Sequence, residues 1–212
     1  PEHQFAWTVL GAVLKQTGRI NESLFAKHKA VELAPLDAQA HYNLSTTLQE
    51  LGRLEEAEAS YTQAIALKPD YAEAYYNLGI TLNELGRLNE AEASYMQAIV
   101  LKPDFAEAYS NLGNSLQELG RLGEAEASYR QAIALKPDYV EAYSNLGNSL
   151  KELGRLGEAE ASYVQAIALK PDYAEAHNNL GATLLELGRL DESEASYTQA
   201  IALKPDYAEA HY

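Results

Sequence analysis

Cysteine is absent from this chain of 212 residues, and its absence excludes two kinds of stabilisation. Without thiols the protein has neither disulfide bonds nor zinc sites built from thiolates. Chains that fold without disulfides are typical of reducing compartments. We therefore expect a cytoplasmic location.

Positive charge is also scarce. The chain has 16 Lys and Arg against 31 Asp and Glu, a formal net charge of -15. Nucleic acids and anionic membrane surfaces both attract clustered cations, so neither is an expected partner. Long apolar runs are missing too, and a membrane-spanning helix needs about 20 such residues. The charge favours neutral or basic protein partners over acidic ones.

Proline is infrequent, and its positions are regular. Successive prolines are 34 residues apart, a period typical of helix-turn-helix repeats. Each copy contacts mainly its neighbours, so function is expected on surfaces that several copies build together. The seven prolines are Pro1, Pro35, Pro69, Pro103, Pro137, Pro171 and Pro205.

One repeat, residues 72–105, predicts two helices. Its first half places small or apolar residues three and four positions apart, which makes one helical stripe. Gly86 is expected to end this helix, since glycine readily adopts positive φ. A second stripe follows, and Pro103 ends it because proline disfavours helical geometry in the preceding residue. Small residues in the Gly79 and Ala91 rows predict a close approach of the two helices.

The recurring order of aromatic, Leu-Gly, Leu, Ala, aromatic, Ala and Pro resembles the tetratricopeptide repeat family. The resemblance implies an all-α fold, a right-handed superhelical α-solenoid of antiparallel helix pairs. It covers one array over 1–212, with partial units at both ends and no polar capping helix, so we expect a fragment of a longer array. The complete units are 4–37, 38–71, 72–105, 106–139, 140–173 and 174–207.

A polar face runs beside the core stripe of each first helix, the side that lines the concave groove in this family. One row on it is constant and is called the asparagine ladder below. A carboxamide has donors and an acceptor, so it can pair with the backbone of an extended peptide. The alternative is that these asparagines bond to a neighbouring helix. The ladder comprises Asn43, Asn77, Asn111, Asn145 and Asn179, and its predicted peptide-binding neighbours are Tyr42, Tyr76, Asn114 and Asn148.

The ladder is also similar to the asparagine row of O-GlcNAc transferases, whose repeats hold substrate peptides. The segment NLGNSLQELGRLGEAEASYRQAIALKPDY carries much of this likeness. The resemblance stops at the repeats, because these residues include no glycosyltransferase domain. It implies a peptide-gripping role for the ladder alone.

Glutamates flank the ladder, where repeats that dock chaperones carry lysine and arginine to hold a carboxylate. The residues of one row are Glu50, Glu84, Glu118, Glu152 and Glu186, and Lys151 lies beside it. A carboxylate partner is therefore not expected. Glu84 precedes Arg87 by three residues, a spacing that favours a local ion pair and an ordinary solvated face.

Two rows lie on the second helices. The tyrosine row, Tyr61, Tyr95, Tyr129, Tyr163 and Tyr197, has core spacing and predicts packing rather than a cofactor site. The row of Thr62, Met96, Arg130, Val164 and Thr198 varies and predicts a weakly constrained convex surface.

No catalytic pattern accompanies these rows. The five histidines share no metal-ligand spacing on one helix face, and the glycines form no phosphate loop. We therefore expect no enzyme activity, no cofactor and no metal. The leading functional hypothesis is a scaffold that binds extended protein segments in its concave groove. Two alternatives are a substrate-recruiting arm of an O-GlcNAc transferase-like enzyme and an end-to-end self-associating module.

Overall fold

The computed structural model describes residues 2–204, and within that range α-helices joined by short turns are the regular secondary structure. Its contacts group it into two compact units, 1–104 and 105–212. The predicted single array therefore stays a prediction, as do the partial units, because Pro1, Pro205 and 208–212 lie outside the described residues. The boundary between the units falls where the third and fourth predicted repeats meet.

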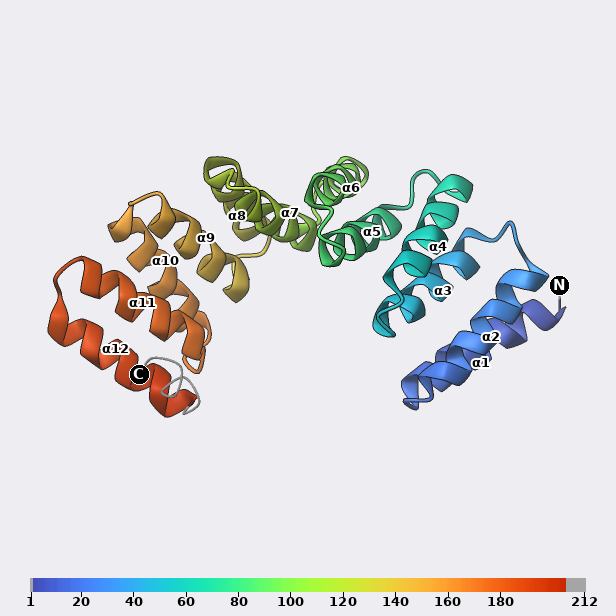
Figure 1. Ribbon diagram of the computed structural model, residues 1–212, viewed down its shortest axis with the longest axis horizontal. Helices are drawn as coiled ribbons and strands as arrows, with labels where there is room; N and C mark the ends of the chain where they lie inside the picture. The colour runs from blue at the N-terminus through green and yellow to red at the C-terminus, as the bar shows by residue number, and fades with distance from the viewer. Residues whose placement is uncertain (1, 205–212) are drawn as a thin grey trace. The chain divides into compact units, whose positions relative to one another are not determined.

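The N-terminal unit contains three helix pairs, each made of two neighbouring helices along the chain (Figure 1). Within a pair the helices are antiparallel, because only a short turn separates them. The six helices are α1 (Glu2–Gln16), α2 (Ile20–Leu33), α3 (Ala38–Glu50), α4 (Leu54–Leu67), α5 (Ala72–Glu84) and α6 (Leu88–Leu101).

The C-terminal unit repeats this arrangement with three further pairs. Neighbouring pairs pack through the second helix of one repeat and the first helix of the next, as α8 against α9 and α10 against α11. The six helices are α7 (Ala106–Glu118), α8 (Leu122–Leu135), α9 (Val140–Glu152), α10 (Leu156–Leu169), α11 (Ala174–Glu186) and α12 (Leu190–Leu203).

Both kinds of predicted helix end are confirmed. Gly86 has φ +74° directly after the C-cap of α5, and its amide donates to the carbonyl of Asn83. At the other end of the repeat, α6 ends at Leu101, and its C-cap, Lys102, lies directly before Pro103. The same pattern holds in all six repeats, so the turns set the helix lengths.

The core passes continuously from one repeat to the next. In the N-terminal unit, Leu24 of α2, Leu48 of α3, Tyr61 of α4 and Ala74 of α5 belong to one buried cluster. Since each helix pair leaves a face for its neighbour, no pair has a complete core alone. The stack, rather than the single repeat, is therefore the stable body.

The glycine row makes room for the tyrosine row. A Cβ added at Gly79 would lie 2.6 Å from Cε1 of Tyr95, closer than carbon atoms approach. The predicted facing of the Gly79 and Ala91 rows is confirmed where serine replaces that alanine, since the Ser193 hydroxyl donates to the Gly181 carbonyl at 2.8 Å. The residue that requires glycine, however, is the tyrosine, an aspect that the pattern of small residues did not indicate.

Candidate peptide-binding face

The first helices of the C-terminal unit carry two hollows on the predicted binding face. One has a volume of about 470 Å³ and the other about 420 Å³. The first is lined by Asn114, Gln117, Glu118, Asn145, Asn148 and Glu152. The second is lined by Gln117, Asn148, Lys151, Glu152, Tyr163, Asn179 and Glu186.

These hollows bring together four of the predicted site residues. Asn145 donates from Nδ2 to Oδ1 of Asn114 at 2.9 Å, and Asn179 donates to Oδ1 of Asn148 at 3.0 Å. Each bond joins a first helix to the first helix of the preceding repeat. The asparagines therefore bond between repeats, as the structural alternative predicted, and they also line the hollows.

Two members of the tyrosine row, which lies on the second helices, reach this face from the core. Tyr129 and Tyr163 are fully buried, which confirms the packing prediction, yet their hydroxyls donate to Asn114 at 2.8 Å and Asn148 at 2.7 Å. Each Oδ1 thus accepts from a tyrosine and from the next asparagine. A side chain held by two partners loses little further freedom when a ligand binds.

Gln117 is a site residue that the sequence reasoning missed. It lies at the border of both hollows, and its Oε1 accepts from Tyr129 and from Ser149, each at 3.1 Å. Its Nε2 donates to Glu152 at 2.9 Å. The row of Gln49, Asn83, Gln117, Lys151 and Leu185 is polar in its first four members, and that run of polar residues was the available signal.

Asn111 lies half-buried on α7 and does not line either hollow. The ladder of the C-terminal unit is therefore not uniform. Asn145 and Asn179 are each paired with an asparagine of the preceding repeat, and these two carry the candidate site.

In the N-terminal unit the ladder has an aromatic partner. Asn77 donates to the hydroxyl of Tyr42 at 2.9 Å, and the Tyr42 ring lies 4.8 Å from that of Tyr71 between centroids. Asn43 accepts from Gln39 at 3.0 Å, and Tyr76 packs near Tyr95 with centroids 6.0 Å apart. Tyrosine here supplies the contacts that asparagine supplies in the other unit.

Negative charge surrounds the hydroxyls on this face. Burial is the main reason that the pKa of Tyr129 lies above its ordinary value, and the charges of Glu118 and Glu152 add to the rise. Burial also raises the pKa of Tyr163, with Glu152, Glu175 and Glu186 contributing. These tyrosines remain neutral hydrogen-bond donors at physiological pH.

The predicted pairing of Glu84 with Arg87 is wrong. Arg87 instead donates to Glu90 at 2.5 and 2.7 Å and to Glu58 of the preceding repeat at 2.6 Å. The positive φ of Gly86 reverses the chain between Glu84 and Arg87, so the arginine turns toward the second helices. Glu84 is therefore not paired with Arg87.

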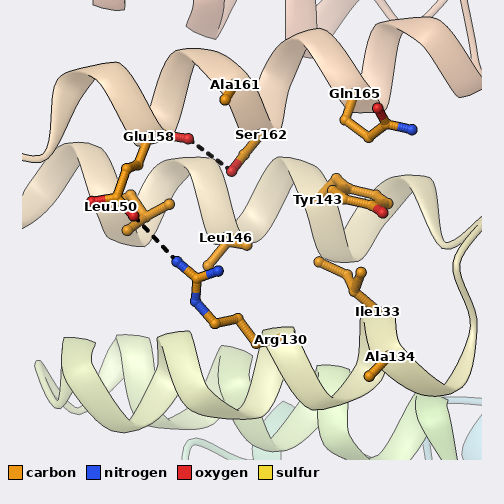
Figure 2. A pocket seen from close by; sticks show the side chains of 10 residues that line it. All are labelled: Arg130, Ile133, Ala134, Tyr143, Leu146, Leu150, Glu158, Ala161, Ser162 and Gln165. Carbon is orange, nitrogen blue, oxygen red and sulfur yellow. Dashed lines mark hydrogen bonds and ion pairs between the residues drawn. The ribbon is translucent and has the colours of Figure 1, made fainter.

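Another hollow, of about 510 Å³, lies on a different face, between α8 and α10 (Figure 2). Tyr143, Leu146 and Leu150 of α9 line it together with Ile133. Figure 2 shows Arg130 reaching across to Glu158, an ion pair of 3.3 Å. Arg130 also pairs with Glu126 at 2.9 Å, so this member of the variable row links two repeats.

Two searches for other kinds of site gave no candidates among the described residues. No cluster of three or more His, Cys, Asp or Glu within 2–204 could hold a metal ion. Within the same range, the helices are all too short or too polar to span a lipid bilayer.

The fold defines an all-α repeat protein built from successive antiparallel helix pairs, and the candidate face is lined by the first helix of each pair. Models of the tetratricopeptide repeat match residues 29–59 and 174–207, and a TPR repeat model matches four segments between 46 and 188. Together these matches extend without a gap from 29 to 207. The chain belongs to the tetratricopeptide repeat family.

Several solved structures are similar to the chain. MamA is 26% identical, with a TM-score of 0.73 over 78% of this chain and 97% of its own. YrrB, described as a TPR protein with an unusual peptide-binding site, is also 26% identical, with a TM-score of 0.72 over 86% and 94%. PilW, a type IV pilus biogenesis factor, shares the fold at 22% identity, with a TM-score of 0.85 over 97% and 95%. A search of curated proteins gives no match.

Proposed function

We propose that this chain is a protein-interaction scaffold that binds extended peptide segments on its first-helix face. The observation that carries the proposal is the pair of adjoining hollows lined by amides from successive repeats. Asn145 uses one amide N–H for Asn114 and has a second N–H and a carbonyl oxygen for a ligand. These groups match the C=O and N–H of a peptide backbone, whatever its side chains.

The comparisons support this proposal at the level of the family. Among the similar structures, YrrB is a TPR protein described by its peptide-binding site. Peptide binding by the present chain is the same use of the same fold. The net charge of -15 favours neutral or basic segments and argues against nucleic acid. No enzyme activity is proposed for the repeats.

Fluorescence anisotropy with labelled peptide pools tests the proposal. The pools are long enough to span both hollows and randomised over small and polar residues. We expect N145A with N179A to weaken binding about thirtyfold, since each of the two lost hydrogen bonds contributes about 1 kcal/mol. N89A, an exposed asparagine on α6, is the matched control.

The melting temperature separates the two roles of the ladder. Binding should fall strongly while the melting temperature falls only slightly, because two part-buried hydrogen bonds between repeats are lost but Asn114 and Asn148 keep their tyrosine partners. If melting drops sharply and the remaining folded protein binds normally, the ladder is structural and the proposal fails.

Two other functions stay open as hypotheses. The asparagine ladder also suits a substrate-recruiting arm of an O-GlcNAc transferase-like enzyme, and a stop codon soon after Tyr212 in the full gene would contradict that hypothesis. Self-association is favoured by the exposed apolar residues of α1, which are Phe5, Val9, Leu10 and Val13. Light scattering across a range of concentrations tests it, and a strict monomer at every concentration would exclude it.

A further inference from the structure

The two hollows of the C-terminal unit share Gln117, Asn148 and Glu152, and they differ in charge because only one of them is lined by a lysine. Equivalent residues of successive repeats line them, with Gln117 and Lys151 at the same position of the repeat. Gln117 donates to Glu152 at 2.9 Å, and Lys151 forms an ion pair with Glu186 at 3.1 Å. Each of these side chains thus reaches the glutamate of the following repeat.

Lys151 demonstrates what this position accepts. Its ammonium group lies against a carboxylate in a hollow lined by Asn148, Asn179 and Tyr163, with 29% of the side chain exposed. In the N-terminal unit, Lys15 and Glu50 occupy the equivalent positions and pair at 2.5 Å. The fold therefore places a lysine against this glutamate row wherever the sequence provides one.

The hollow lined by Glu118 and Glu152 has carboxylates but no cation from the chain. Among the described residues, neither glutamate forms an ion pair with lysine or arginine, and Gln117 offers Glu152 only a neutral amide. Their combined charge is felt at the hydroxyl of Tyr129, which lies beneath. An unbalanced charge in a partly enclosed, amide-lined hollow favours a ligand that supplies the opposite charge.

We propose that this hollow is a subsite for a basic side chain, lysine or arginine, of the bound peptide, and that Lys151 excludes such a side chain from the adjoining hollow. The proposal rests on the proposed peptide-binding function. The ladder amides at Asn145 and Asn114 would hold the peptide backbone, while Glu118 and Glu152 receive the charged end.

The experiment uses three peptide pools that differ only at a central position, which is lysine, norleucine or glutamate. Norleucine keeps the aliphatic stem of lysine and removes its charge. Binding of the full chain is measured by anisotropy at low and physiological salt. We expect the lysine pool to bind about fivefold more tightly than the norleucine pool and the glutamate pool to bind most weakly, with the differences shrinking as salt rises.

Variants of the hollow then show which residues cause the preference for the lysine pool over the norleucine pool. Q117K should abolish it, because the new lysine is placed to pair with Glu152 as Lys151 does with Glu186. E152Q keeps the acceptor for Gln117 and should also weaken the preference. K151Q should strengthen it, since it releases Glu186. Q131K on α8 and E194Q on α12 make the same charge changes at exposed positions away from the hollow and should leave it unchanged.

Each result has one meaning. Equal binding of the lysine and norleucine pools overturns the subsite and leaves the peptide-binding function standing. A lysine preference that persists at full strength in folded Q117K also overturns the subsite. Binding of no pool overturns the proposed function, and the subsite with it. Circular dichroism melting of each variant identifies any loss of binding that comes from unfolding.

Discussion

The two units build the same scaffold and anchor the asparagine ladder differently. In the N-terminal unit Asn77 bonds to the hydroxyl of Tyr42, whereas in the C-terminal unit Asn145 bonds to Asn114. The position of Tyr42 is occupied by buried serines in the fourth and fifth repeats, which are too short to reach. An asparagine four residues later then supplies the acceptor. The hydrogen bond of the ladder asparagine is thus kept in both units, because an asparagine acceptor takes the place of the tyrosine hydroxyl. The side chains around the ladder change from aromatic rings to amides.

The difference also has a chemical consequence. Aromatic rings bury apolar area and prefer apolar partners or cations over their faces. Amides present donors and acceptors that read a peptide backbone. Under the proposed function, the N-terminal unit would recognise side chains, and the C-terminal unit would recognise the peptide backbone and its charge.

The largest expected effect tests whether the cores of the two units are equivalent. G79A and G147A each place a methyl group 2.6 Å from a tyrosine ring, so both should destabilise by about 1–2 kcal/mol despite the better helix propensity of alanine. G181A is the control, because its Cβ would lie 3.1 Å from Tyr197. Urea denaturation measures all three. A large difference between G79A and G147A would break the equivalence.

The next effect concerns the first repeat, where Lys27 replaces the core tyrosine. Lys27 is 5% exposed and donates to Thr47 at 2.5 Å. Gly11 lies opposite, so K27Y should restore the packing of the other repeats and stabilise by about 1 kcal/mol. Thermal melting checks this expectation. A lower melting temperature would mean that the first repeat has adapted to the lysine.

The same residue predicts a dependence on pH. Burial lowers the pKa of Lys27 to about 8, with the charge of Lys15 adding to the shift and that of Glu50 opposing it. The unfolded state then binds more protons between pH 8 and 10.5, so stability should rise by about 1 kcal/mol from pH 7 to 9. K27Y should lose this slope. A slope retained in the variant would assign it to another group.

A smaller effect tests the exchange of anchors between the units. N148I alone removes the acceptor of Asn179 and of Tyr163, and should cost about 1 kcal/mol. S144Y combined with N148I recreates the residues at Tyr76 and Ile80 of the third repeat, and should recover much of that cost. A double-mutant cycle by urea denaturation gives the coupling. If the stability changes of S144Y and N148I simply add, the tyrosine does not replace the lost asparagine acceptor.

The smallest effect should be the same in both units. Hydrogen bonds from Arg87 and Arg189 lower the pKa of Glu90 and Glu192. Carboxylates with a lowered folded pKa stabilise above their unfolded value near 4.5 and lose that contribution as the pH falls through the folded value. R87M and R189M should reduce acid resistance slightly and equally, because each arginine is the only cation that lowers the pKa of its glutamate. Acid titration followed by circular dichroism measures it, and unequal shifts would show that these contacts differ between the units.

Most of the fold was predictable because it depends on local rules repeated many times. Gly86 and Pro103 mark helix ends through backbone geometry alone, and the tyrosine row follows from helical periodicity. The candidate site was predictable only in part. The ladder was found as a constant row, but Gln117 was missed because its row varies. The predicted partner of Arg87 was wrong because the turn at Gly86 directs this arginine toward Glu58 on a second helix.

The sequence by itself determined the repeat, its two helices and the rows that successive copies place in line, since each of these follows from spacing along the chain. The tertiary structure decided which members of those rows meet. Asn145 pairs with Asn114, Gln117 reaches Glu152, and Tyr129 reaches the binding face from the core. These contacts join residues 15 to 35 positions apart. Their geometry depends on how one helix pair packs against the next, which no local pattern specifies.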